Sequence, residues 1–218
     1  MLTQALYDFN VEMGSLAKAQ GALLMTYHVP FNEPQINTYW LGIAIHFAKA
    51  EGADRFLTYT ARDSTKGNQL KRLWWCCIIR DRMMALGLRR SIFIASTAFE
   101  EVWPLPTIDD LKTEIGQSRV CSAPVKMKLS KSLLALCRLC TALTSILQLL
   151  YPADGVHVIA DRLDLLKRIY TYTDELNHWH DSTTSDADPC DPHEKSSKTV
   201  ILFTSILNIY FEYDEFPS

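Results

Sequence analysis

The hydrophobic positions along the chain recur mostly at intervals of three and four residues, which is the period of an amphipathic α-helix. The first such segment covers residues 6–27, and Pro30 and Pro34 close it. A second helix is predicted over 39–51, with Gly52 at its C-terminal end. The apolar residues of this second helix lie on most of its sides, so we expect it to be interior.

Longer helices are predicted in the middle of the chain. A polar segment, 61–69, leads into a helix that Gly87 should terminate. Residues 88–124 look irregular because they hold several prolines, with a short helical turn over 107–115. The longest helix follows over 125–151. Its apolar seam alternates steps of four and three residues and consists of Leu129, Leu133, Leu136, Cys140, Leu143, Leu147 and Leu150.

The last part of the chain contains two further helical patterns separated by a loop. Residues 157–179 have helical spacing, and residues 199–213 are apolar nearly all round. Between them, residues 182–198 are too poor in apolar side chains to pack, so we expect an exposed loop. The sequence shows almost no strand pattern. We therefore predict an all-α, irregular multi-helix fold that forms a single domain over 1–218.

Composition and charge narrow the class of protein. The 218 residues are 48% hydrophobic and carry a net charge of -3, so the chain has a globular composition and no global basic field to attract nucleic acid. The apolar run 133–151 contains Arg138, which favours a buried helix over a membrane span. The N-terminus has no secretory signal pattern. The six cysteines are therefore expected to be reduced, in an intracellular compartment, and to pack as small hydrophobic residues.

Motifs for metal binding or catalysis are weak. Cys137 and Cys140 have the spacing of zinc and redox sites, but no second pair lies at a suitable distance, so core packing is favoured. His178 and His180 would point about 200° apart on a helix and would not share a metal there. No Gly-x-Ser-x-Gly elbow, phosphate-binding glycine loop or His-Glu-x-x-His run occurs. We predict no catalytic residues, no metal and no cofactor.

The stretch KRLWWCCIIRDRMMALGLRR, residues 71–90, places a charge among large apolar groups. On a helix, Asp81 shares one side with Trp74, Cys77 and Ile78. An ionised carboxylate in that position needs a partner. The candidates are the arginines that follow it, Arg82, Arg89 and Arg90. A buried structural ion pair is favoured over an acid or a ligand-binding anchor, because structural ion pairs commonly produce this pattern.

The same stretch resembles the signature of the fungal-specific transcription factor domain, the middle regulatory region of zinc-cluster (Zn2Cys6) activators. In that family, a Trp-Trp pair precedes Asp-Arg and a Gly-x-Arg segment. Segments on both sides resemble the neighbouring family helices, and the similarity is closer to the branch that includes the cutinase-type transcription factors. These segments are AQGALLMTYHV (19–29), NTYWLGIAIHFAKAEGADR (37–55), SRVCSAPVKMKL (118–129) and KTVILFTSILNIYFEY (198–213).

The resemblance implies an all-α regulatory domain in the nucleus or cytoplasm that controls transcription. It implies no DNA binding by this chain, because the zinc cluster of the family uses six closely spaced cysteines and none here precedes Cys76. Ser91 stands where the family usually has proline. The chain also ends near the last matched helix, where family members normally continue, so we expect truncation at both ends relative to the family, either as a fragment or as a reduced stand-alone protein. The residues expected to define the domain as structural anchors are Trp74, Trp75, Asp81, Arg82, Gly87, Arg89 and Arg90.

Three functional hypotheses follow. The favoured one is control of transcription through a small-molecule effector or a partner protein, such as the transcription machinery or a full-length activator. The second is a stand-alone enzyme or auxiliary factor of a biosynthetic pathway, which would need a pocket where Asp81, Tyr39, His46 or His178 converge. The third is an interaction module that forms a homodimer or binds an activator through the apolar helix 199–213. No membrane contact is expected.

Overall fold

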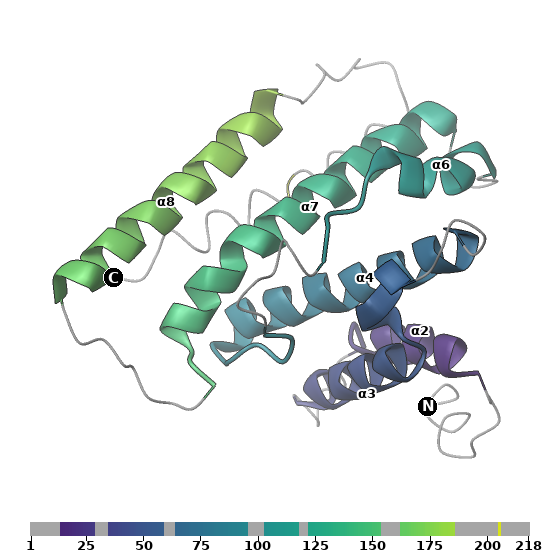
Figure 1. The fold of residues 1–218 in the computed structure, drawn as a ribbon, viewed down its shortest axis with the longest axis horizontal. Helices are drawn as coiled ribbons and strands as arrows, with labels where there is room; N and C mark the ends of the chain where they lie inside the picture. Colours follow the sequence, from purple (N-terminus) through teal and green to yellow (C-terminus); the bar gives the residue numbers. More distant parts are fainter. Residues whose placement is uncertain are drawn as a thin grey trace. The chain divides into compact units, whose positions relative to one another are not determined.

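The computed structural model confirms the all-α prediction. Every regular element in the part of the chain that the structure describes is a helix, and no strand occurs there (Figure 1). The described residues are 14–28, 35–58, 64–95, 103–117, 122–153, 162–185 and 205. The predicted helix 199–213, apart from residue 205, and most of the predicted loop 182–198 lie outside these residues.

The helices follow the hydrophobic spacing of the sequence, with shifted ends. They are α2 (Ser15–Met25), α3 (Ile36–Ala50), the 3-10 helix η1 (Ala53–Thr58), α4 (Ser64–Leu88), α6 (Ile108–Gln117), α7 (Ala123–Leu150) and α8 (Arg162–Ser185). The chain divides into two compact units, residues 1–84 and 85–218, and the boundary falls inside α4. The single domain expected over 1–218 stays a prediction.

Two segments that we predicted to be non-helical are partly helical. α4 begins at Ser64, within the polar segment 61–69, and α8 continues to Ser185, into the predicted loop 182–198. Adding a residue to an existing helix is much easier than nucleating one, so polar turns extend a helix that an apolar face has already formed. At the start of α4, an ion pair of 3.1 Å between Lys66 and Glu51 adds a contact that periodicity does not reveal.

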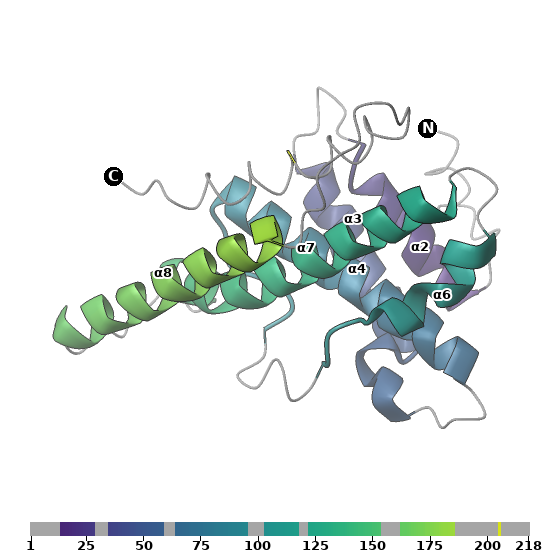
Figure 2. The same cartoon turned by 90° about the horizontal axis from the view of Figure 1, so that it is seen from above.

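In the first unit, α2 packs along α3, and α3 contacts η1 (Figures 1 and 2). α3 buries Trp40, Ala44 and Ala48, which recur at helical spacing. Its other side carries Tyr39 and His46, and both are exposed. The prediction of an interior helix was therefore wrong, because apolar and aromatic residues on one side of α3 remain accessible to solvent.

α3 ends beside Gly52, as the sequence predicted. Gly52 has a φ of 82°, in the left-handed region that favours glycine. Its N–H donates to the carbonyl of Lys49 at 2.9 Å. This bond uses one of the carbonyls that the end of a helix leaves without an intrahelical partner, so the glycine turns the chain directly into η1.

In the second unit, α7 lies antiparallel to α8 and also contacts α6 (Figures 1 and 2). Trp179 of α8 is buried, and its Nε1 donates to the carbonyl of Ala135 on α7 at 2.8 Å. α6 replaces the short turn predicted over 107–115. The N–H of Thr107 donates to the Asp110 carboxylate at 2.8 Å, which caps the start of this helix.

The buried face of α7 is broader than the predicted seam. Leu129, Leu133 and Leu136 are half-buried, and Leu150 is exposed. The buried residues of α7 are Val125, Ser130, Ala135, Cys137, Leu139, Cys140, Leu143, Thr144 and Leu147. A wide apolar stripe is what a core-facing helix of a globular unit needs, whereas a coiled coil uses a narrower one.

Within the described residues, α7 is also the one helix that is long and apolar enough to cross a membrane. The core helix of a folded unit has the same length and composition. Here α7 contacts both α6 and α8, and the buried Trp179 donates a hydrogen bond to its backbone. These contacts give α7 the position of a core helix in the second unit.

Trp179→Phe should lower the free energy of unfolding by about 1 kcal/mol, because it removes the hydrogen bond to Ala135 and keeps an aromatic ring in place. Trp179→Ala should cost about 3–5 kcal/mol, because it also leaves a cavity. Chemical unfolding followed by circular dichroism measures both. Equal losses for the two variants would show that the hydrogen bond, and not the packing of the ring, attaches α8.

Candidate functional site

The signature stretch forms most of α4 and is largely buried. Trp74 and Trp75 are among the largest fully buried side chains described, and Cys77 is buried beside them. Cys76 is only half-buried, so it departs from the core packing that we expected of the cysteines. The buried residues of α4 are Leu70, Leu73, Trp74, Trp75, Cys77, Ile78, Ile79, Asp81, Arg82, Met83, Met84, Ala85 and Leu86.

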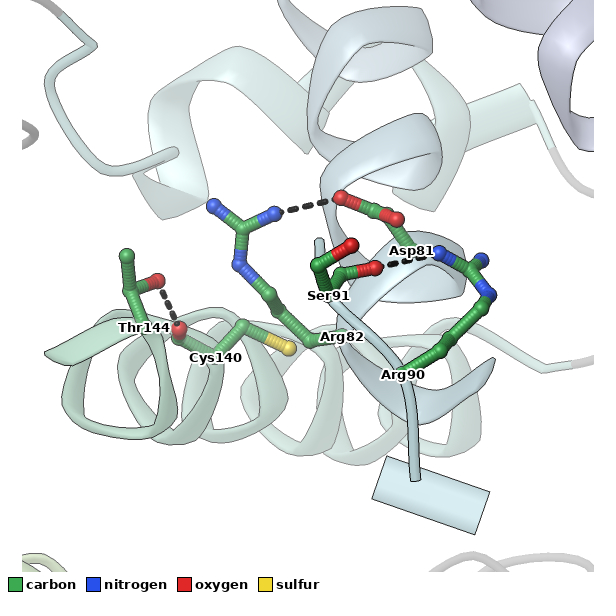
Figure 3. A network of polar contacts seen from close by, with 6 residues as sticks. All are labelled: Asp81, Arg82, Arg90, Ser91, Cys140 and Thr144. Atoms are coloured by element: carbon green, nitrogen blue, oxygen red, sulfur yellow. Dashed lines mark hydrogen bonds and ion pairs between the residues drawn. The ribbon is translucent and has the colours of Figure 1, made fainter. Parts of the chain in front are cut away.

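A buried ion pair lies in the C-terminal third of this helix. The Nη1 atom of Arg82 donates to Oδ2 of Asp81 at 2.7 Å, and both side chains are 0% exposed (Figure 3). Adjacent residues on a helix point about 100° apart. The long arginine side chain spans this angle and brings its guanidinium to the neighbouring carboxylate. Of the three arginines considered from the sequence, Arg82 therefore provides the observed partner.

Neither buried charge could stay ionised alone at an acceptable cost. Moving a carboxylate or a guanidinium out of water costs several kcal/mol, and the mutual attraction of the pair offsets this only when the geometry is good. A separation of 2.7 Å is within the range of a charge-assisted hydrogen bond. The full burial of the pair gives a soluble substrate no access to the carboxylate.

Arg80 is a residue of this site that the sequence analysis missed. Its Nε donates to Oγ1 of Thr26 at 2.8 Å and its Nη2 donates to the Thr26 carbonyl at 2.5 Å. The guanidinium also lies 4.0 Å from the centroid of the Tyr27 ring, within the range of a cation–π contact. Thr26 follows the last residue of α2, so Arg80 ties α4 to the end of α2 inside the first unit. No spacing rule links residues 54 positions apart.

The end of α4 corrects the role that we assigned to Gly87. The helix continues to Leu88, and the residue in the left-handed conformation is Arg89, with a φ of 51°. The N–H of Arg89 donates to Leu86, and that of Arg90 donates to Ala85, at 3.4 and 3.1 Å. This pair of bonds is a Schellman motif, in which the left-handed position usually holds glycine. The sequence prediction failed because an arginine occupies that position.

Arg90 and Ser91 form a separate polar contact after the helix. The Nη1 atom of Arg90 donates to the Ser91 carbonyl at 2.7 Å (Figure 3). The guanidinium also lies 4.0 Å from the centroid of the Phe93 ring. Arg89 is exposed, whereas Arg90 is half-buried. The three arginines considered as partners for Asp81 therefore have three different surroundings, and the structural-anchor role of the whole set stays a prediction.

The four cysteines among the described residues, Cys76, Cys77, Cys137 and Cys140, are free thiols. Burial raises the pKa of the Cys77 thiol, and the nearby Cys76 and Asp81 raise it further, so the thiol stays protonated and a poor nucleophile. Cys137 and Cys140 are buried free thiols, as core packing predicts. Next to them, the Thr144 hydroxyl donates to the Cys140 carbonyl at 2.7 Å (Figure 3). Across the described segments, no group of three potential metal ligands occurs.

The residues proposed for an enzymatic pocket have different surroundings. Asp81 is fully buried and paired with Arg82. Tyr39, His46 and His178 are exposed. A shared pocket needs groups that converge in one partly enclosed space. A fully buried ion pair and side chains exposed on the surface do not form such a space.

Comparison with known proteins identifies the family. The model of the fungal specific transcription factor domain matches residues 3–181, which is most of the chain. The chain therefore belongs to the fungal-specific transcription factor domain family. This is a family of transcription factors and not of enzymes. The matched residues include the whole of α4 and most of α8. No solved structure matches the chain.

Individual relatives agree with this assignment. The cutinase transcription factor 1 beta of Fusarium vanettenii is 32% identical over 160 residues, which cover 68% of this chain and 18% of the relative. A transcription factor of Fusarium pseudograminearum (strain CS3096) is 38% identical over 95 residues, covering 43% of this chain and 10% of the relative. The transcription factor cpaR of Aspergillus oryzae is 29% identical over 122 residues, which cover 54% of this chain and 20% of the relative. The chain thus matches a fifth or less of the length of these curated relatives.

Asp81→Ala should lower the free energy of unfolding by about 3–5 kcal/mol, because it leaves the buried Arg82 guanidinium without this carboxylate. The double variant Asp81→Leu/Arg82→Met should recover most of the loss, since apolar groups of similar volume replace both charges. Urea unfolding followed by circular dichroism gives the three values. A double variant as unstable as the single one would contradict the buried-pair account.

Arg89→Gly should raise the free energy of unfolding by about 1 kcal/mol, because glycine adopts a positive φ without the steric cost of a side chain. For a chain of this size, the melting temperature should rise by about 2–4 °C. Arg89→Ala is the matched control. It removes the same charge but keeps the strained φ, so its melting temperature should not rise. A fall in the melting temperature of Arg89→Gly would mean that the arginine side chain outweighs the backbone strain.

Proposed function

We propose that this chain is a regulatory region that modulates transcription by binding an effector or a partner protein. The observation that carries the proposal is the family match over residues 3–181, together with the 32% identity to a cutinase transcription factor. Membership of a transcription factor family supports a nuclear role. The buried Asp81–Arg82 pair supports a structural anchor in α4, not a reacting group.

The proposed mechanism is a shift between two arrangements of the helices. A ligand moves such an equilibrium only by the difference between its affinities for the two arrangements. The Asp81–Arg82 pair and the bonds from Arg80 to Thr26 stabilise the packed form of the first unit, so that this form persists as a defined state. An effector or partner that prefers one arrangement would then mask or expose an activating surface.

The proposed partners are the transcription machinery or a full-length activator, bound through helical surfaces, and a small-molecule effector. The net charge of -3 supports a chain that does not bind DNA directly. Membrane contact is not part of the proposal, since α7 contacts α6 and α8 as a core helix. The apolar segment 199–213, proposed as a dimerising surface, lies outside the described residues apart from residue 205.

A reporter assay tests this function. The chain is inserted between a heterologous DNA-binding domain and an activation domain, and output is compared across a panel of small molecules and growth conditions. An allosteric coupling of ordinary size should change the output about fivefold or more in at least one condition. The same fusion without the chain should show no such change.

Two variants separate regulation from misfolding. Asp81→Ala should weaken the response in step with its loss of stability, whereas Arg89→Gly should keep both the response and the fold, since Arg89 is exposed. If the wild-type fusion gives the same output under every condition as the fusion without the chain, the regulatory proposal fails.

A further inference from the structure

The exposed side of α3 carries a line of residues without charge. Tyr39, Gly42, Ile43 and His46 recur at steps of three and four residues, so they lie within about 100° of one another round the helix. Tyr39 is 55% exposed, Gly42 and His46 are exposed, and Ile43 is half-buried. We call these four residues the outer face of α3. An accessible helix face of this composition is typical of a surface that binds another protein.

Gly42 leaves room in the middle of this face. A Cβ atom added at Gly42 would meet no neighbouring atom within 4 Å. Tyr39 and His46 lie about one turn away on either side. A partner helix can therefore approach the backbone of α3 closely at Gly42, with a ring side chain on each side of the contact.

The charges of α3 and of α2, which packs along it (Figures 1 and 2), indicate what kind of helix fits. Residues 14–28 and 35–50 contain two lysines and two histidines but no aspartate or glutamate, although the whole chain has more acidic than basic residues, 25 against 22. Nζ of Lys18 lies 5.2 Å from the centroid of the Phe47 ring, so this positive charge of α2 lies against α3. Lys49 is exposed about 60° round the helix from His46.

These charges favour a partner of opposite charge over a second copy of the chain. Two copies paired through this face would bring together only neutral and positive groups, and the lysines would gain no opposite charge. A nucleic acid fits less well, because apolar side chains occupy the face and two lysines neutralise few phosphates. A helix with an apolar side and acidic flanks matches both the apolar line and the lysines beside it.

We propose that the outer face of α3 binds an acidic amphipathic helix of a partner protein. The apolar side of that helix lies against Tyr39, Gly42 and Ile43, and its acidic residues lie beside Lys18 and Lys49. This inference rests on the proposed function, because it states the chemistry of the partner which that function requires. The surface lies within the first unit and differs from segment 199–213.

Fluorescence anisotropy of labelled synthetic peptides tests the proposal on the whole chain. The probe is a helical peptide of about 16 residues, roughly the length of α3, with leucine along one side and glutamate elsewhere. A second peptide has lysine in place of each glutamate, and a third has the acidic composition in scrambled order. The acidic amphipathic peptide should bind with a Kd of about 10–100 μM, and the other two about tenfold more weakly. Equal binding of the acidic and basic peptides, or no binding of the acidic one, would overturn the proposal.

Gly42→Gln separates binding from folding. The new side chain occupies the space above the backbone without adding charge, so the affinity for the acidic peptide should fall by about tenfold. Because the substitution removes a glycine from the interior of a helix, the melting temperature should rise. Gly116→Gln is the matched control, since Gly116 is exposed on α6 and has the same open space around it. The proposal is wrong if Gly42→Gln binds like the wild type or if both variants lose affinity equally.

Lys49→Glu tests the charge of the site. It should weaken the acidic peptide about threefold and strengthen the basic peptide by a similar factor, because exposed charge pairs contribute little. High salt should reduce both effects. Lys131→Glu makes the same change of net charge at an exposed position of α7 and should leave both affinities unchanged. Equal effects of the two variants would mean that net charge, and not a contact at α3, determines binding.

Two further measurements distinguish this inference from its alternatives. If the wild type dimerises at about 100 μM in analytical ultracentrifugation and Gly42→Gln stays monomeric, a second copy covers the face and the proposal is overturned. In the reporter assay, a response that Gly42→Gln leaves unchanged would overturn this surface while the regulatory function stands. A fusion that never responds, from a chain that binds the acidic peptide, would instead contradict the regulatory function and support the surface.

Discussion

The buried contact between Asp81 and Arg82 is the central electrostatic constraint on α4. Both side chains are fully removed from solvent, and each has the opposite charge of the other 2.7 Å away, which offsets part of the cost of burying it. A rotation of the helix that exposed one member would leave the other uncompensated. We therefore expect the pair to restrict the rotation of α4 about its axis. Apolar packing alone restricts it less, because many apolar side chains can exchange positions at modest cost.

Three consecutive residues of α4 show how a helix divides its contacts. Arg80 binds the end of α2, whereas Asp81 and Arg82 satisfy each other. Because each residue is turned by about 100° from the one before, a short charged run can reach several surroundings at once. This explains how a dense cluster of charged and aromatic residues can resemble an active site in sequence and still serve packing.

The sequence predicted most of the helices and the burial of Asp81, because both follow from local periodicity. The partner of Asp81 was left open among three arginines, since sequence spacing does not show how far a long side chain bends. The contact of Arg80 with Thr26 depends on tertiary packing and has no local signal. The prediction that Gly87 ends α4 was wrong. Glycine is common at helix ends, but here Arg89 is the residue with the left-handed backbone conformation. The exposed side of α3 was missed because an apolar count does not show which side lacks a partner.

The left-handed conformation of Arg89 also affects how this chain can diverge in evolution. Selection at this position acts first on the backbone, which admits glycine readily, asparagine next, and β-branched residues hardly at all. The positive charge itself is exposed and under no packing constraint. Position 81 is restricted in the opposite way, since its backbone is ordinary helix and its charge has a buried partner. Positions 89 and 81 should therefore accept different sets of substitutions. The backbone conformation limits those at 89, and the buried charge of the partner limits those at 81.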